Sequence, residues 1–249
     1  METKWQPPPL YQSEQLTPSV VAYYQKAMGS FNWLSTHTRP DMTQAVNKLC
    51  ETNSCPSPSH LEALKHLFRY LNGTVDWGIT LRGKEFTMKD LGLQIFADAA
   101  FDDDPIQRYS TGGHVVMAGA GPVYWKSKKQ SLVALSSTEA EFINLTPAGQ
   151  SAIWLAKILE EAGCPQKTPF ILFTDSANAQ QIALNPENAA RTRHIDIRYK
   201  WIQDRVRKGD FKLQHVLTAE MIADGLTKPL GKEKFAQFVK MIGVGPRPW

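Results

Sequence analysis

The second half of the chain alternates short apolar runs with longer amphipathic segments, and this order allows few architectures. From about residue 91 onward the pattern predicts three strands, a helix, a strand, helices, a strand and a closing helix over AEMIADGLTKPL. Strands that alternate with helices in this way build a mixed sheet covered by helices. We therefore expect an α/β domain over residues 91–230.

The first half of the chain has apolar residues spaced three and four apart, as in amphipathic helices. This spacing predicts three helices between about Val20 and Leu71, followed by a short strand in WGITLRG. The proline-rich start is expected to be a flexible lead-in. The predicted organisation is a lead-in over 1–18, a helical segment over 19–90, the α/β domain over 91–230, and a C-terminal helix and tail over 231–249.

Charge and cysteine content narrow the class of protein. The formal net charge of +4 fits an anionic partner without requiring one. The three cysteines form no metal-binding or paired pattern, which suits a reducing intracellular compartment, cytoplasmic or nuclear. No apolar run approaches the roughly 20 residues that span a bilayer.

Acidic residues stand where the predicted strands and helices end or begin. Asp98 and Asp175 each end an apolar strand, Glu139 and Glu141 start the long helix, and Asp224 lies in the predicted last helix. Ligands of open α/β sheets gather at the carboxyl ends of strands. Acids that converge there repel one another unless a cation neutralises them. Oxygen ligands without a cysteine or histidine set favour Mg²⁺ or Mn²⁺, and two such ions would serve phosphodiester hydrolysis.

Each of these acids taken alone has a plainer structural explanation. Asp175 can cap the helix that follows it, and Glu139 and Glu141 both fit capping boxes that begin at a serine or threonine. Asp224 alone is typical of a solvated helix. The hypothesis of a metal site therefore depends on the acids as a set.

Several separate motifs resemble the C-terminal end of copia-type retrotransposon polyproteins, where a connection segment of the reverse transcriptase precedes ribonuclease H. The motifs are YWKSKKQSLVALSSTEAEF, RTRHIDIRYKWIQD and IADGLTKPL in the second half, and MGSFNWLSTHTRPDMTQAVNKL and HLEALKHLFRYLNGTVDWGITL in the first. The likeness covers nearly everything from Tyr23 to Leu230. It implies a ribonuclease H-like fold, with a five-stranded mixed sheet flanked by helices and preceded by a small helical segment.

The resemblance also implies a site and a reaction. Its Asp-Glu-Asp-Asp set falls on Asp98, Glu141, Asp175 and Asp224, and Glu141 is preferred to Glu139 because Phe142 follows it. The set implies two Mg²⁺ ions, with Mn²⁺ as a substitute, and hydrolysis of the RNA strand of an RNA–DNA hybrid. The hybrid and the polymerase part of the same polyprotein are the implied partners, and an active element would place the chain in virus-like particles.

Basic residues interleaved with aromatic ones indicate where a phosphate backbone is expected to bind. They lie after Trp125 and between Arg191 and Lys208, where a stripe of apolar residues is also expected to face the core. Two small polar residues after Asp175 are weaker candidates. The expected nucleic-acid contacts are Lys126, Lys128, Lys129, Arg191, Arg193, His194, Arg198, Ser176 and Asn178.

Some features depart from the pattern of the family. Ala100 and Phe101 stand where the family often has aspartate and tryptophan, Pro147 falls inside the predicted long helix, and Gly225 loosens the predicted last one. Two other functions therefore stay open: a nucleic-acid-binding remnant with weak or no catalysis, and a structural piece that docks on a polymerase. Since no Tyr-x-Asp-Asp stretch of a polymerase occurs, the chain is expected to be a truncated element or a fragment kept by a host.

Overall fold

The structure is a computed structural model, and it divides the chain into two compact units. The first, here the helical unit, comprises Met1–Thr80 and Pro229–Trp249, and the second, the sheet unit, comprises Leu81–Lys228. For 196–199 only the backbone is described. The described residues are 16–81, 91–101, 103–104, 107–119, 121–184 and 196–247.

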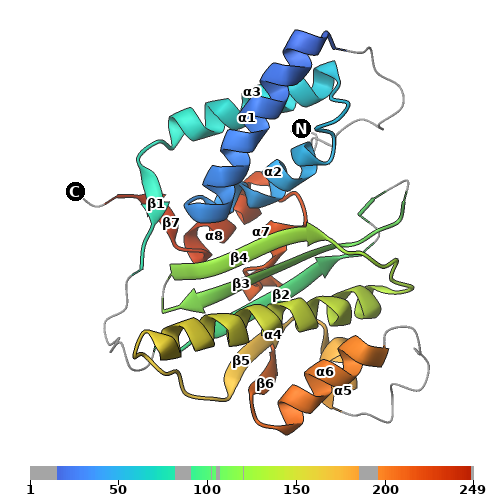
Figure 1. Cartoon of the computed structure of the whole chain (residues 1–249), viewed down its shortest axis with the longest axis vertical. Coiled ribbons are helices and arrows are strands. Elements are labelled where there is room, and N and C mark those ends of the chain that lie inside the picture. Colours follow the sequence, from blue (N-terminus) through green and yellow to red (C-terminus); the bar gives the residue numbers. More distant parts are fainter. Residues whose placement is uncertain are drawn as a thin grey trace. The chain divides into compact units, whose positions relative to one another are not determined.

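The sheet unit is built on five strands in the order β4-β3-β2-β5-β6 (Figure 1). The first three strands along the chain are antiparallel neighbours: β2 (Gln94–Ala100), β3 (Thr111–Ala118) and β4 (Gly121–Lys129). β5 (Phe170–Thr174) runs parallel to β2, and β6 (Phe211–His215) runs parallel to β5. This mixed sheet confirms the predicted ribonuclease H-like fold class.

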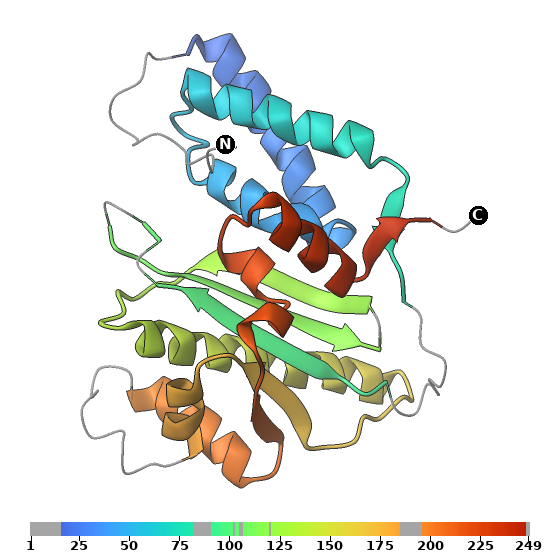
Figure 2. The same ribbon diagram turned by 180° about the vertical axis from the view of Figure 1, so that it is seen from behind.

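Helices cover both faces of the sheet, with α4 (Ser137–Glu161) on one face and α7 (Asp224–Thr227) on the other (Figures 1 and 2). The core beneath α4 includes Ile95, Phe142 and Leu172, each fully buried. The same core takes in residues of two further helices, α5 (Ala177–Leu184) and α6 (Asp196–Arg207). The apolar stripe predicted for the basic helix therefore does face the core, at least at Ile202.

Two consecutive glycines of β3 allow the helices to approach the sheet closely. A Cβ atom on Gly112 would collide with the side chain of Asn144 in α4, and one on Gly113 would lie 2.7 Å from Cγ2 of Thr227 in α7. Consecutive residues of a strand face opposite sides of the sheet. The two glycines therefore explain how α4 and α7 can pack against the backbone of the same strand from opposite sides.

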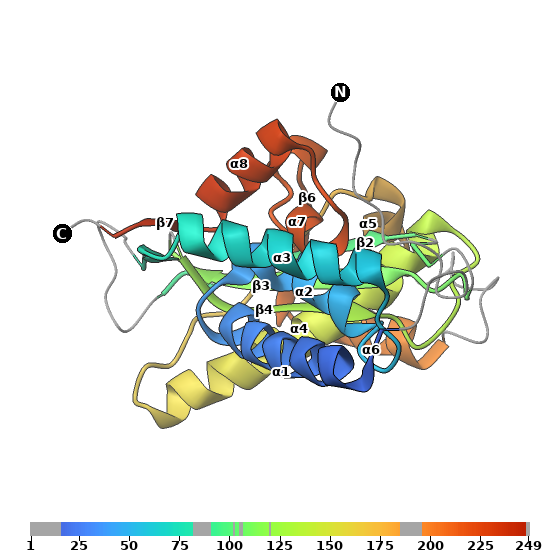
Figure 3. The ribbon, with the colours of Figure 1, turned by 90° about the horizontal axis from the view of Figure 1, so that it is seen from above.

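The helical unit contains the three predicted helices, α1 (Pro18–His37), α2 (Thr43–Cys50) and α3 (Pro58–Gly73), which lie together in Figure 3. A 3₁₀ turn, η1 (Pro40–Met42), precedes α2. Large side chains fill the core between the helices and are 0–2% exposed. They include Tyr24, Met28, Phe31 and Leu64.

The last residues of the chain complete the helical unit with α8 (Lys232–Met241) and β7 (Val244–Pro246). The predicted strand in WGITLRG is shorter than expected, β1 (Trp77–Ile79), and it pairs antiparallel with β7. A local pattern could not reveal this pairing, because the two strands lie at distant positions in the sequence.

The predicted closing helix over AEMIADGLTKPL is wrong. The segment instead forms a 3₁₀ turn, η4 (Thr218–Glu220), and the four-residue helix α7. Pro147 does not interrupt its helix, because α4 contains it and runs continuously from Ser137 to Glu161. None of the helices in the described part of the chain combines the length and apolar character needed to cross a bilayer.

Candidate metal site

The ends of β2 and β5 lie at the point where two neighbouring strands separate. Their parallel pairing ends at Phe96 and Phe173. Asp98 lies two residues further along in β2, and Asp175 directly follows the last residue of β5. Beyond that point β2 stays paired only with β3 on its other side. A crevice at the carboxyl ends of such strands is where open α/β sheets place ligands.

Asp98, Glu141 and Asp175 come together at this place. Each offers one carboxylate oxygen, and the three oxygens lie within 4.8 Å of one another. Asp98 is 1% exposed and Glu141 is 8% exposed, whereas Asp175 is only partly buried. Within the described ranges no other group of acidic, histidine or cysteine side chains meets this geometry.

The two glutamates at the start of α4 have different roles. Glu139 accepts a hydrogen bond from the backbone N–H of Leu135 at 2.7 Å, and its own N–H donates to Oγ of Ser136 at 3.2 Å. These bonds satisfy the start of the helix. Glu141 lies two residues further along, and its carboxylate points to Asp98 and Asp175 instead.

The electrostatics of Glu141 indicate that no cation of the described residues stabilises its ionised form. Burial, followed by the charge of Asp98 and a hydrogen bond with it, raises the pKa of Glu141 to about 10, and Asp175 adds to the shift. Its Oε2 atom is buried and has no hydrogen-bond partner among the described residues. An unpartnered carboxylate oxygen in an oxygen-only donor set fits a hard divalent cation.

Asp224 lies beside this cluster and has a cation of its own. Oδ1 of Asp224 is 2.7 Å from Nζ of Lys228, and the same Nζ is 3.8 Å from Oδ2 of Asp98. Burial and the neighbouring Asp98 raise the pKa of Asp224 to about 6, while Lys228 acts in the opposite direction. The structure thus brings all four predicted acids to one place, with three in a tight group and the fourth in an ion pair.

Hydrogen bonds from two threonines orient the two aspartates at the strand ends. The hydroxyl of Thr227 donates to Oδ2 of Asp98, and the hydroxyl of Thr218 donates to Oδ2 of Asp175 at 2.9 Å. Asp175 does not cap α5, because Ser176 accepts the hydrogen bond from the N–H of Ala179 at 3.2 Å. The side chain of Asp175 is therefore available to the cluster.

Asn144 fixes the backbone that carries Asp98. Its Nδ2 atom donates to the carbonyl oxygen of Asp98 at 2.8 Å and to that of Gly113 at 2.7 Å. Asn144 is 4% exposed, so both bonds form away from water. One side chain of α4 therefore ties β2 and β3 together at the site.

The residues predicted to contact nucleic acid differ in how the structure places them. Lys126 and Lys128 are exposed on β4, whereas Nζ of Lys129 forms an ion pair with Asp104 at 2.6 Å. A phosphate would have to compete with that carboxylate. Asn178 is exposed near the start of α5, next to the capping residue Ser176. Three candidates, Arg191, Arg193 and His194, lie outside the described residues, as does the side chain of Arg198.

Sequence reasoning missed four residues that contact the acids. Lys228 had a usable signal, since it follows Asp224 at the i+4 spacing of helical ion pairs within the quoted motif IADGLTKPL. Thr227, in the same motif, had no such signal. Neither did Asn144 and Thr218, because their partners are remote in sequence and become neighbours only in the folded chain.

Comparison with known proteins identifies relatives over most of the chain. No family model matches it. The chain is 36% identical over 235 residues to the retrovirus-related Pol polyprotein from transposon RE1 of Arabidopsis thaliana, covering 94% of this chain and 16% of that protein. It is 35% identical over 221 residues to the Pol polyprotein from transposon TNT 1-94 of Nicotiana tabacum, covering 89% of this chain and 16% of that protein.

Among solved structures, LC11-RNase H1 in complex with an RNA/DNA hybrid is similar with a TM-score of 0.39 and 13% sequence identity, covering 54% of this chain and 93% of that one. The assignment rests on the sequence relatives, of whose length this chain spans 16%. The chain belongs to the family of retrovirus-related Pol polyproteins of copia-type transposons.

Proposed function

We propose that the sheet unit is a divalent-metal-dependent endoribonuclease that hydrolyses the RNA strand of RNA–DNA hybrids. The observation that carries the proposal is the group of Asp98, Glu141 and Asp175, with its buried and unpartnered Glu141 oxygen. Such a group is costly to fold without a cation, because like charges at short range oppose ionisation. The ribonuclease H-like fold and membership of the Pol polyprotein family support the same reaction class.

The proposed ion is Mg²⁺, with Mn²⁺ as a substitute, and the active complex is proposed to contain two ions. Asp98, Glu141 and Asp175 would hold one, and Asp98 with Asp224 the other. When bound, such ions stabilise the charge on the attacking and leaving oxygens of an in-line displacement at phosphorus. Water adds to phosphorus and the bond to the 3′ oxygen breaks, leaving a 3′-hydroxyl and a 5′-phosphate.

The chain's own residues position this chemistry. Thr227 and Thr218 hold the carboxylates of Asp98 and Asp175 in fixed orientations, so that little reorganisation is needed when a substrate binds. The partial exposure of Asp175 leaves one side of the group open to a phosphate. The exposed Lys126 and Lys128 on β4 would attract the nucleic-acid backbone.

Cleavage of a hybrid with a labelled RNA strand tests the proposal. We expect RNA fragments with 5′-phosphate ends in the presence of Mg²⁺ or Mn²⁺, and none with EDTA. Asp98→Asn and Asp175→Asn should each lose at least about a hundredfold in rate, because each removes a charged ligand. Hybrid binding that falls with salt, with no cleavage in either metal, would instead indicate a nucleic-acid-binding remnant.

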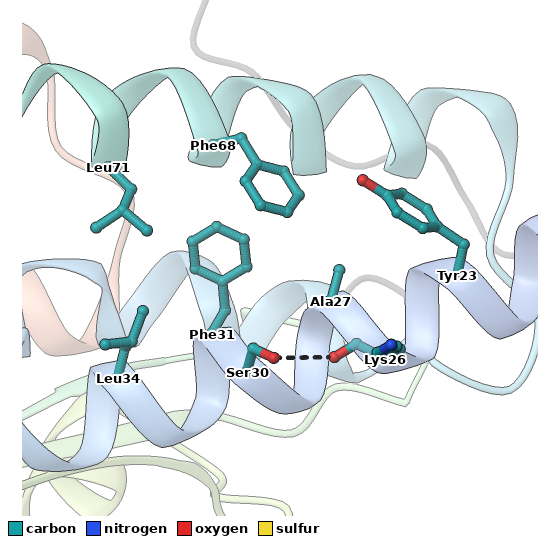
Figure 4. Close-up of a pocket in the computed structure, with 8 residues that line it drawn as sticks. All are labelled: Tyr23, Lys26, Ala27, Ser30, Phe31, Leu34, Phe68 and Leu71. Atoms are coloured by element: carbon teal, nitrogen blue, oxygen red, sulfur yellow. Dashed lines mark hydrogen bonds between the residues drawn. The ribbon is translucent and has the colours of Figure 1, made fainter. Parts of the chain in front are cut away.

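A second role, compatible with the first, is docking on the polymerase part of the same polyprotein. It is favoured by an apolar pocket of about 270 Å³ between α1 and α3 of the helical unit (Figure 4). Tyr23 and Phe68 at this pocket are 56% and 40% exposed. Exposed aromatic side chains around an apolar hollow are typical of a protein interface. The proposed occupant of this pocket is the polymerase part. The relatives are Pol polyproteins, and the segment that matches this chain is only 16% of their length.

Binding of the chain to a separately produced polymerase part of the RE1 relative tests this role. Phe68→Glu should weaken binding by at least about tenfold, because it places a charge in the apolar contact. Val75→Glu is the matched control, since Val75 is 75% exposed and does not line the pocket. Equal effects of the two substitutions would show that the pocket is not the interface.

A further inference from the structure

Lys228 is placed among the acids of the site, although sequence reasoning gave it no role. Its ammonium group lies 2.7 Å from Asp224 and 3.8 Å from Asp98. Of the lysines and arginines in the described part of the chain, it alone lies within ion-pair distance of any of the four acids. The cation that the chain itself supplies is therefore on the Asp224 side of the cluster.

Contacts of the neighbouring residues fix the position of Lys228. Thr227, which directly precedes it, is 0% exposed and donates its hydroxyl hydrogen to Asp98. The backbone N–H of Lys228 donates to the carbonyl oxygen of Asp224 at 3.2 Å. The close contact between α7 and Gly113 holds this backbone against β3. The ammonium group therefore starts from an anchored Cα atom.

The carboxylates that face Lys228 are shielded from water. The side chain of Asp224 is 13% exposed and that of Asp98 is 1% exposed, so their attraction for a cation is weakly screened. The ammonium group neutralises the Asp224 side of the site. No lysine or arginine of the described chain forms an ion pair with Glu141.

We propose that Lys228 occupies the second-ion position of the free protein, so that the free chain binds one divalent ion at Asp98, Glu141 and Asp175 and excludes a second from Asp98 and Asp224. This inference rests on the proposed function for its relevance, but it concerns cation binding and not cleavage. A second ion can then bind only when the ammonium group moves to another anion, and a phosphate of the bound hybrid is an anion of that kind.

Counting bound Mn²⁺ in the hybrid-free protein, by the electron paramagnetic resonance signal of the unbound ion, tests this inference. The wild type should bind one Mn²⁺ and Lys228→Met should bind two, because methionine keeps the length of the side chain and removes its charge. Lys228→Arg keeps the charge and should still bind one. Lys157→Met is the matched control, because it removes an exposed lysine of α4 outside the group of acids.

The thermal transition of each variant, measured alongside, shows that the protein is folded. Lys228→Gln is the second charge-removing variant and carries the test if Lys228→Met does not fold. Two Mn²⁺ ions in the wild type, or one in the folded charge-removing variants, would overturn the inference. A count that changes from one to two while no hybrid is cleaved would uphold the inference and reject the proposed function. Hybrid cleavage together with the same Mn²⁺ count in the wild type and in the folded charge-removing variants would reject the inference and uphold the proposed function.

Discussion

The backbone of Gly113 in β3 lies so close to Thr227 in α7 that a Cβ atom on the glycine would sit 2.7 Å from Cγ2 of the threonine. The same Cβ would also lie 2.8 Å from Cβ of Leu226. The strand thus provides a flat surface on which the short helix rests, and the helix carries Asp224 at its start and Thr227 at its end. The geometry of the site depends on this contact.

Gly113→Ala should therefore destabilise the sheet unit and impair the site together. The added methyl group must push α7 away from β3, and overpacking of this kind costs about 1–3 kcal/mol. Thermal unfolding should show a lowered midpoint, and hybrid cleavage should fall because Thr227 no longer reaches Asp98. Gly29→Ala is the control: nothing lies within 4 Å of its new Cβ, and helix α1 should gain up to about 1 kcal/mol. Equal midpoints for the two variants would contradict the role given to Gly113.

The raised pKa values of Glu141 and Asp224 predict how stability depends on pH without metal. These pKa values are about 10 and about 6 in the folded chain, against ordinary values of 4.5 and 3.8. Between the ordinary and the raised value the folded state binds more protons than the unfolded chain, so the free energy of unfolding falls as pH rises through this window. Unfolding in EDTA should therefore show lower stability at about pH 8 than at about pH 5.

Mg²⁺ should restore the stability that the acids lose at higher pH, because it binds their ionised forms. We expect its stabilising effect in thermal unfolding to be larger at about pH 8 than at about pH 5. Glu141→Gln should flatten the pH dependence in EDTA, since glutamine does not titrate. A Mg²⁺ effect of the same size at both pH values would show that the ion binds elsewhere.

The lowered pKa of His114 predicts a second pH dependence of the free energy of unfolding. It has the opposite sign and falls in an acidic pH range. Burial, with a smaller contribution from Lys126, lowers its pKa from 6.5 to about 4, and its Nε2 lies 3.0 Å from Oγ of Ser151. Between these values the unfolded chain binds more protons than the folded one. This contribution to stability is therefore present above the ordinary value of 6.5 and is lost as pH falls toward about 4.

Replacing His114 isolates this contribution. His114→Gln keeps a hydrogen-bonding group near Ser151 and removes the titration, so its free energy of unfolding should depend less on pH between about 4 and 6.5 than that of the wild type. Urea unfolding across this range measures the difference. Parallel pH profiles for the two proteins would mean that His114 does not titrate differently on folding.

The order of strands and helices could be predicted because each segment carries its own period. The acids at the ends of β2 and β5 were also predictable, since the end of an apolar run is a local signal. The pairing of β1 with β7 was not, because neither short strand shows which remote segment completes it. The closing helix was predicted too long, because the buried Met221 and Leu226 are held by tertiary packing and not by one continuous helix.

The candidate site likewise has features that the sequence predicts and features that it does not. Spacing alone left Glu139 and Glu141 equivalent, because both follow a serine or threonine by three residues. The structure separates them by the direction of their side chains, which depends on where α4 meets the end of β2. The contacts of Thr218 and Asn144 also depend on tertiary packing, and no periodic pattern encodes them.

We propose that the group formed by Asp98, Glu141 and Asp175 holds the metal of a ribonuclease. Comparing Glu141 with Glu139 tests this directly, because both are buried glutamates and they lie two positions apart on one helix. Glu141 joins the group of acids, whereas Glu139 caps the helix. The measurement is the rate of hybrid cleavage in Mg²⁺ by Glu141→Gln and by Glu139→Gln. We predict a loss of at least about a hundredfold for Glu141→Gln and a rate within a few-fold of wild type for Glu139→Gln. Cleavage by Glu141→Gln at the rate of the Glu139→Gln control would contradict the claim.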